Sequence, residues 1–249
     1  MTQAQKIIKY LAVAFAISLV IAIIYTISMG LYSITSIFKE NDSNKENMNI
    51  VNCENITNIS YLDLELDNSN LIIKESDNFK IESNTNKISC NQNNEAIKIK
   101  ENSNTLEKIN SKDLIIYLPK DIVLSKMEIE ICIGKINIYG LETQKLNLEL
   151  GLGNITIKES KINNLDLDQG IGKIDITSIL NGFNKIETGI GVTNIKLIGT
   201  ESDYKIEIEK GIGPVKVNDI NVSDNEIAGT GLNLIKLETG IGSTKVNIK

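Results

Sequence analysis

The chain has 249 residues, with 26 Lys or Arg against 32 Asp or Glu, so its formal net charge is −6. Every basic residue is Lys, and the sequence contains no Arg, no His and no Trp. The missing imidazole excludes the nucleophile systems and metal sites built on histidine, and an acidic chain lacks the basic surface that nucleic acids require. We therefore expect no nucleic-acid partner.

The first element in chain order is an apolar segment at residues 11–37. No charged residue interrupts it between Lys9 and Lys39, and it exceeds the roughly 20 residues that cross a ~30 Å hydrocarbon core. Lys6 and Lys9 precede the segment, and positive charge stays on the cytoplasmic side of a membrane. The sequence therefore predicts a cytoplasmic N-terminus at 1–10, one transmembrane helix, and a chain that continues outside the cytoplasm. A cleaved signal peptide is the alternative, although its apolar region is usually shorter.

Residues 38–50 form a polar segment rich in Asn. This composition is typical of a flexible spacer between a membrane and a folded domain. An extension of the anchor helix by a turn or two is the alternative. The folded part is predicted to occupy residues 51–249.

Short strand-like segments fill the first part of this domain. They alternate between apolar and polar residues, or are apolar throughout, and clusters of Asn, Ser and Asp separate them. Pro119 is expected to end the last one, because proline has no N–H group for a neighbouring strand. We expect these segments to cap the repeat that follows; they lie at 61–66, 70–75, 79–83, 96–100 and 113–119.

An internal repeat extends from residue 127 to residue 249. Each copy alternates between apolar and polar residues, contains a Gly-apolar-Gly unit and then alternates again. The second glycine of this unit recurs at a constant spacing in the first four copies and at two longer spacings after them. These glycines are Gly134, Gly153, Gly172, Gly191, Gly213 and Gly242. The stretch 218–232 lengthens the last interval and is expected to be an inserted loop.

The parity of the apolar residues changes within each copy. Leu146 to Leu152 are apolar at every second position, but after Gly153 the apolar positions become Ile155 and Ile157. A flat strand cannot change parity, because its side chains alternate with a period of two. The sequence therefore predicts a corner at each glycine, where positive φ is allowed without strain.

A fixed period combined with a fixed strand pattern is typical of a solenoid. We predict an all-β, single-domain β-solenoid at 51–249, built of ~19-residue strand–glycine corner–strand repeats and preceded by one N-terminal transmembrane helix.

The glycine pairs also have two functional interpretations. A phosphate cradle would require a helix after the strand, whereas here another strand follows. A calcium-binding repeat would require a denser pattern of Gly and Asp, and the counterparts of Asp175 are Asn137 and Thr156. We therefore predict a structural role for the glycines, with no metal site and no cofactor.

Paired carboxylates are the remaining candidates for catalysis. The pairs Glu128/Glu130 and Glu207/Glu209 could supply an acid and a base if their surroundings separated their pKa values. At positions i and i+2 of a strand, however, such residues usually form a solvated outer face. We predict no catalytic residues, no enzymatic activity and no small-molecule substrate.

The three cysteines do not define a disulfide framework. Cys53 and Cys90 could pair outside the cell, but the sequence does not fix the connectivity. Cys132 stands where the next copies have Gly151 and Gly170, on the face that is predicted to be exposed.

The order of these segments resembles the bacterial putative-adhesin family, which comprises membrane-anchored β-solenoid domains of unknown function. The resemblance covers residues 50–249 and rests on YLDLELDNSNLIIKES, LIIYLPKDI, the glycine pairs and the closing GTGLNLIKLETGIGSTKVNI. The sequence departs from the pattern at Cys132, Thr188 and Thr239, which affect packing. The resemblance implies a β-helical domain of the cell envelope and brings no catalytic motif with it.

Two functions are therefore considered. The first is a membrane-anchored adhesin, envelope scaffold or binding module without catalytic activity, located at the cell membrane as a single-pass protein. Its partners would be the lipid bilayer through residues 11–37 and an envelope polymer or a membrane protein. The alternative is an accessory or sensor protein in envelope-stress signalling that acts through a membrane partner.

Overall fold

A computed structural model of the chain describes residues 48–53, 58–93, 96–102 and 112–249. The predicted transmembrane helix at 11–37 lies outside these residues. Within the described residues, no helix is long and apolar enough to cross a membrane.

The described part of the chain is almost entirely β-structure, as predicted, and its strands form one 16-stranded sheet. The strands are β1 (Asn49–Ile50), β2 (Tyr61–Ser76), β3 (Lys80–Ser83), β4 (Ile88–Asn93), β5 (Ala96–Glu101), β6 (Lys112–Pro119), β7 (Lys126–Tyr139), β8 (Glu142–Thr143), β9 (Leu146–Asn163), β10 (Leu165–Asn181), β11 (Phe183–Leu197), β12 (Tyr204–Ile212), β13 (Val215–Val217), β14 (Ile220–Asn221), β15 (Ile227–Gly229) and β16 (Asn233–Ile248). A short 3₁₀ helix, η1 (Glu201–Asp203), precedes β12.

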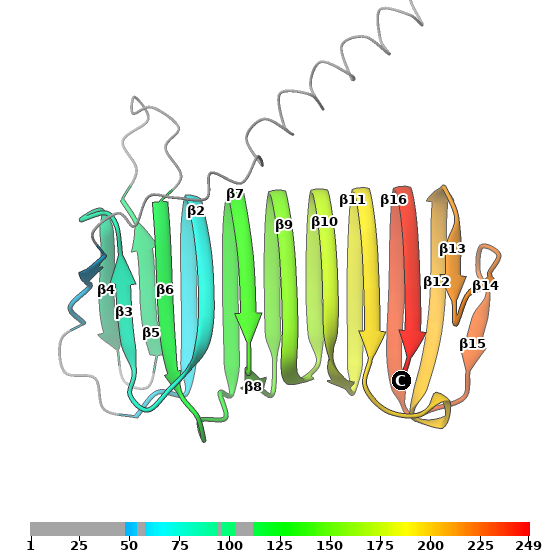
Figure 1. Cartoon of the computed structure of the whole chain (residues 1–249), viewed down its shortest axis with the longest axis horizontal. Helices are drawn as coiled ribbons and strands as arrows, with labels where there is room; N and C mark the ends of the chain where they lie inside the picture. Colours follow the sequence, from blue (N-terminus) through cyan, green and yellow to red (C-terminus); the bar gives the residue numbers. More distant parts are fainter. Residues whose placement is uncertain (1–47, 54–57, 94–95, 103–111) are drawn as a thin grey trace, which may run out of the picture. The chain divides into compact units, whose positions relative to one another are not determined.

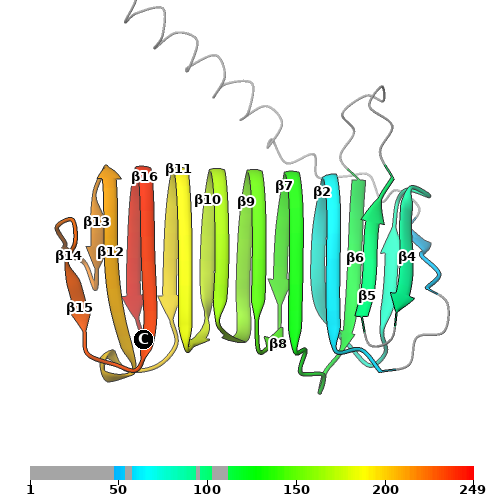
Figure 2. The ribbon, with the colours of Figure 1, turned by 180° about the vertical axis from the view of Figure 1, so that it is seen from behind.

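Six long strands, namely β2, β7, β9, β10, β11 and β16, each turn near their middle. The first half of each strand lies in one layer and the second half in the opposite layer (Figures 1 and 2). We call one such turn of the chain a coil. Neighbouring coils pair in parallel, and Gly134, Gly153, Gly172 and Gly191 are register partners, so equivalent residues of successive repeats lie side by side.

The glycine corners have the geometry that the parity change requires. Leu150 and Ile155 are both fully buried although they are an odd number of positions apart, so the side-chain alternation is reset between them. At Gly172 the backbone has φ +149°, and a Cβ atom there would overlap the carbonyl oxygen of Gly153 in the preceding coil. Glycine is therefore required both for the backbone conformation and for the close approach of the two coils.

The core consists of apolar side chains that stack from coil to coil. One inward position is buried in every coil, with at most 2 % of each residue exposed. Burying a side chain of this size contributes roughly 1.5–3 kcal/mol, so the stack provides much of the driving force for folding. This row is Leu64, Ile129, Leu148, Leu167, Ile186, Leu237 and Ile208.

Two coils carry threonines before the corner, at a position where β2, β7 and β9 have apolar residues and β10 has Gln169. Thr188 and Thr193 are buried on either side of the corner of β11, and their hydroxyl oxygens are 2.9 Å apart. Thr239 and Thr244 form the same pair in β16, at 3.0 Å. The departure of Thr188 and Thr239 from the repeat is therefore compensated by a hydroxyl partner across the corner.

We expect Thr188→Val alone to lower the free energy of unfolding by about 1–2 kcal/mol, because it leaves the buried Thr193 hydroxyl without its partner. Thr188→Val combined with Thr193→Val should recover most of this loss, since both polar groups are removed together. Urea unfolding of the two single variants and the double variant measures the coupling. Additive losses in the double variant would contradict the pairing.

At the C-terminal end the coils do not stack in the order of the chain. β16 lies between β11 and β12, so Gly242 pairs with Gly191 although Gly213 lies between them in the sequence (Figure 1). Pro214 gives a physical reason: it has no N–H to donate, and an outermost coil tolerates that loss better than a central one. The stretch 218–232, predicted as a loop, contains the short strands β14 and β15.

Both ends of the parallel stack are closed by antiparallel strands. At the C-terminal end β15 pairs with β12 and β14 with β13; at the other end β4 pairs with β5 and β3 with β6. β1, at the end of the predicted linker, pairs with β3. Short antiparallel strands cover edges that would otherwise remain open for pairing with other chains. β6 ends at Pro119, as predicted.

The segments 61–66 and 70–75, predicted as separate strands, are the two halves of β2. This coil turns at Asn68–Ser69 without a glycine. The buried carboxylate of Glu101 accepts hydrogen bonds from the backbone N–H groups of Asp67 and Asn68, at 3.0 and 3.2 Å. It also accepts one from the Ser69 hydroxyl and forms an ion pair with Lys112. A side chain from β5 therefore stabilises this corner.

Candidate functional site

The outward side chains of the first layer include a continuous row of carboxylates. One Asp or Glu occupies the same register position on seven neighbouring strands. Paired strands lie about 4.8 Å apart, and like charges placed directly opposite each other are destabilising. Such a row is therefore a candidate for function. This carboxylate row consists of Glu65, Glu130, Glu149, Asp168, Glu187, Glu238 and Glu209.

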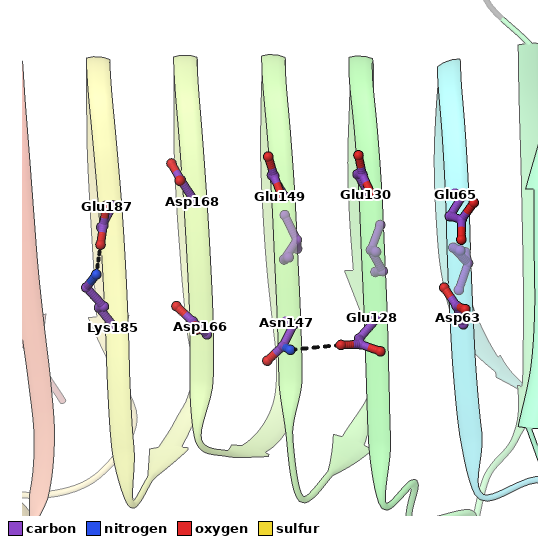
Figure 3. A pocket seen from close by; sticks show the side chains of 13 residues that line it. Asp63, Glu65, Glu128, Glu130, Asn147, Glu149, Asp166, Asp168, Lys185 and Glu187 are labelled. Carbon is purple, nitrogen blue, oxygen red and sulfur yellow. Dashed lines mark hydrogen bonds and ion pairs between the residues drawn. The ribbon is translucent and has the colours of Figure 1, made fainter.

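A second, mixed row lies two residues earlier on each strand. Together the two rows line an open, shallow groove of about 580 Å³ that extends from β2 to β11. Figure 3 shows these side chains at two levels of each strand, all on the same side of the layer. The second row consists of Asp63, Glu128, Asn147, Asp166 and Lys185.

Lysines compensate the charge at both ends of the carboxylate row. Lys98 is 2.8 Å from Asp63 and also contacts Glu65. Hydrogen bonds from Lys100 and Lys98 lower the pKa of Glu65. At the other end Lys236 is 2.8 Å from Glu238, and its hydrogen bond lowers the pKa of that carboxyl.

The middle of the row has no such compensation. Among the described residues, Glu130, Glu149 and Asp168 of this row, and Asp166 of the second row, form no ion pair with a lysine. They lie on the adjacent strands β7, β9 and β10 (Figure 3). The negative charge available to a partner is therefore concentrated at the centre of the face.

Glu128 and Glu130, which were considered as an acid–base pair and assigned to a solvated surface, lie on this outer face. Glu128 contacts Lys126 at 2.7 Å, accepts a hydrogen bond from Tyr61 and accepts another from the Asn147 amide at 3.1 Å. The hydrogen bonds from Lys126 and then Tyr61 lower the pKa of Glu128, whereas burial and this contact raise the pKa of Tyr61 to about 12. Glu128 is therefore held in its ionised form at neutral pH.

The second pair considered from the sequence, Glu207 and Glu209, lies on the same face. Glu207 contacts Lys205 at 2.7 Å, and Glu209 contacts Lys236 at 3.0 Å. Both carboxylates are therefore occupied by surface ion pairs.

The second layer carries the opposite charge. At least one outward lysine lies in the second half of each of the six long strands, and we call the surface formed by one such lysine from each strand the lysine face. Asp175, which was considered as a calcium ligand and rejected because its counterparts are Asn137 and Thr156, lies among these lysines. Its carboxylate contacts Lys173 at 2.6 Å and accepts a hydrogen bond from Asn194 at 2.9 Å. The lysine face consists of Lys74, Lys135, Lys158, Lys173, Lys196 and Lys245.

Sequence reasoning did not recognise this separation of charge between the two layers. The sequence did contain the pattern that predicts this separation. At each corner the outward positions change parity together with the inward positions, so outward residues before and after a corner belong to different layers. Lysines that follow the glycines therefore belong to the opposite face from carboxylates that precede them.

A strip without side chains borders the carboxylate row on the side of the corners. It is formed by glycines such as Gly151 and Gly170, and Cys132 takes the equivalent place on β7. Cys132 is exposed, as predicted, and its thiol is free. Burial and then the charge of Asp67 raise the pKa of this thiol, which makes it a weak nucleophile.

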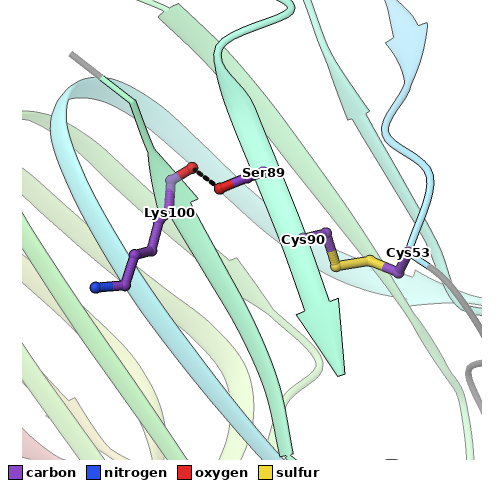
Figure 4. The surroundings of a disulfide bond; sticks show 4 residues. All are labelled: Cys53, Ser89, Cys90 and Lys100. Atoms are coloured by element: carbon purple, nitrogen blue, oxygen red, sulfur yellow. Dashed lines mark hydrogen bonds between the residues drawn. A yellow bond between two sulfur atoms is a disulfide. The ribbon is translucent and has the colours of Figure 1, made fainter. Parts of the chain in front are cut away.

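The other two cysteines form a disulfide, which the sequence had left open. Cys53 and Cys90 are bonded with their Cα atoms 5.0 Å apart (Figure 4). The bond joins the segment after β1 to strand β4, at the N-terminal end of the stack. Beside it, the Ser89 hydroxyl donates to the carbonyl of Lys100 at 3.3 Å, which further ties β4 to β5.

Comparison with known proteins gave matches among solved structures. No family model matches the chain, and no curated protein matches it. A putative cell adhesion protein from Clostridium sporogenes ATCC 15579 has a TM-score of 0.48 and 19 % identity, covering 82 % of this chain and 99 % of that one. A putative adhesin from Bacteroides fragilis NCTC 9343 has a TM-score of 0.42 and 14 % identity, covering 82 % of this chain and 98 % of that one.

Proposed function

We propose that this chain is a membrane-anchored extracytoplasmic β-solenoid that serves as an adhesin or envelope scaffold. Residues 11–37 act as the anchor and residues 51–249 as the binding domain. The domain binds through its flat outer faces and carries out no catalysis.

The carboxylate row is the observation that carries this proposal. Seven like charges on seven adjacent strands form a regular lattice, and such a lattice suits a repetitive partner that makes many weak contacts at once. The groove over these strands is open and lined mainly by charged groups. Sites for small molecules are, in contrast, usually concave and mostly apolar.

The disulfide supports a position outside the cytoplasm. Disulfides persist in oxidising compartments and are rare in the cytosol, where thiols are kept reduced. The Cys53–Cys90 bond joins residues 37 apart, so it is part of the domain architecture. An extracytoplasmic domain is the simplest setting for such a bond.

Deleting residues 51–249 while keeping residues 1–50 should reduce the attachment of the native cells to surfaces or to each other several-fold. Attachment of wild-type and deleted cells under flow measures this effect. Exchanging residues 11–37 for an unrelated membrane span is the matched control, and it should leave attachment intact. Protease added to intact cells should remove the domain.

Two outcomes would count against the proposal. Full protection of the domain from external protease would contradict the extracytoplasmic position. The signalling alternative would be favoured if the deletion left attachment unchanged but altered the envelope-stress response, and if exchanging residues 11–37 also abolished that response.

A further inference from the structure

We propose that the face of one copy that bears the carboxylate row, which we call the carboxylate face, docks on the lysine face of a second copy. The copies would then stack face to face. This inference goes beyond the proposed function and does not depend on adhesion. It rests on the opposite charges of the two faces, on the strands that the two faces share, and on charged side chains of each face that form no ion pair in the described part of the chain.

Each long strand carries opposite charges on its two halves. The first half contributes a carboxylate to one face, and the second half contributes a lysine to the other. On β9, for example, these residues are Glu149 and Lys158, and on β11 they are Glu187 and Lys196. Because the halves lie in opposite layers (Figures 1 and 2), the charge is separated across the thickness of the domain.

The two faces have the same spacing because they belong to the same strands. Successive carboxylates follow the strand separation of about 4.8 Å at a single level. The lysines lie on the same strands but at three levels: Lys74, Lys158 and Lys196 at one, Lys135 and Lys173 at another, and Lys245 between them. When one copy is translated onto the next, each carboxylate-bearing strand can therefore face a lysine-bearing strand over the whole length of the stack. A partner with an unrelated spacing would match at a few positions only.

Both faces also keep charges that a single copy does not neutralise. In the described part of the chain, Glu130, Glu149 and Asp168 form no ion pair with a lysine. The ammonium groups of Lys158 and Lys196 likewise form none with a carboxylate there. Electrostatic complementarity of this kind guides association and fixes the register of two surfaces.

The size of the faces predicts a weak association. Seven strands span roughly 30 Å, and the outward part of one layer spans roughly 20 Å, so each partner would bury about 600 Å². This value lies at the low end for specific interfaces, where transient complexes are found. Because the contact joins two different faces, it does not close on itself and can continue to further copies, all in one orientation.

Sedimentation velocity of the full chain in a neutral detergent tests this inference. We expect larger species to appear with rising protein concentration at about 50 mM NaCl and to be lost at about 500 mM, where charges are screened within a few ångströms. Glu149→Lys with Asp168→Lys should weaken the association roughly tenfold, and so should Lys158→Glu with Lys196→Glu. All four reversals in one chain should restore part of it, because the new lysines on one face and the new carboxylates on the other again attract each other.

Asp121→Lys with Glu159→Lys is the matched control for the carboxylate reversal, since it makes the same change in net charge at exposed positions outside both faces. It should leave the association close to that of the wild type. Circular dichroism checks that each variant is folded. A chain that stays monomeric at low salt overturns the inference, and so does association that all variants share, because the anchor or the micelle would then be its cause. A monomeric chain that binds polylysine would assign the carboxylate face to a different, cationic partner.

Discussion

Replacing Gly172 with alanine will lower the free energy of unfolding by about 4 kcal/mol or more, enough to unfold much of the domain at room temperature. The backbone of Gly172 has φ +149°, a conformation that residues with a Cβ rarely adopt. The added Cβ would also overlap the carbonyl oxygen of Gly153, which is backbone and cannot move without separating the two coils. The same overlap exists at each glycine corner of the stack, so relaxing one corner disturbs its neighbours.

Urea unfolding of the full chain, followed by circular dichroism, measures this effect. Lys173→Ala is the matched control, because Lys173 is the next residue and its ion pair with Asp175 lies at the surface. Surface ion pairs contribute up to about 1 kcal/mol, so the control should shift the midpoint only slightly. If Gly172→Ala unfolded at the same urea concentration as Lys173→Ala, the corner would not depend on glycine.

The corners could be predicted because their cause lies in local sequence. A parity change beside Gly153 is sufficient to require a bend, and the constant spacing of the first four glycines is sufficient to align successive bends. The inward rows of Leu and Ile follow from the same alternation. These features need no information on which distant strands meet.

The order of the last coils could not be predicted, because the competing segments are too similar. Residues 187–191 and 238–242 have the same sequence, ETGIG, and the β12 segment has EKGIG. Nothing in these short stretches determines which of them pairs with β11. The choice depends on the packing of the whole end, where Pro214 suits the outermost coil and β14 and β15 cover its edge.

The carboxylate row was only partly predictable from the sequence. The sequence placed Glu128 with Glu130, and Glu207 with Glu209, on an outer face, and the structure confirms this. The carboxylates from β7 to β12 each stand four residues before the second glycine of their copy, so the repeat aligns them whichever of β12 and β16 follows β11. Glu65 could not be added to the row from the sequence, because β2 has no glycine corner and its register with β7 is seen only in the structure.

Removing the disulfide by Cys53→Ser with Cys90→Ser should lower the free energy of unfolding of the N-terminal end by up to about 4 kcal/mol. This value is the chain entropy that the bond removes from the unfolded state, given the sequence separation of 37 between the cysteines. The loss should be local, because the bond joins the segment after β1 to β4, at the margin of the stack. Amide hydrogens in β4 and β5 should exchange faster, while those in β10 and β11 should keep their wild-type rates.

Hydrogen exchange of the full chain, measured with and without reductant, tests this localisation. Cys132→Ser is the matched control, since it removes an exposed free thiol and leaves the disulfide in place. The unfolded, non-reduced wild type should contain one reactive thiol, and the reduced protein three. Three thiols before reduction would show that the bond does not form. Faster exchange spread evenly over all coils would instead mean that the end strands support the whole stack, because loss of the antiparallel cover would then expose β2 and the core rows behind it.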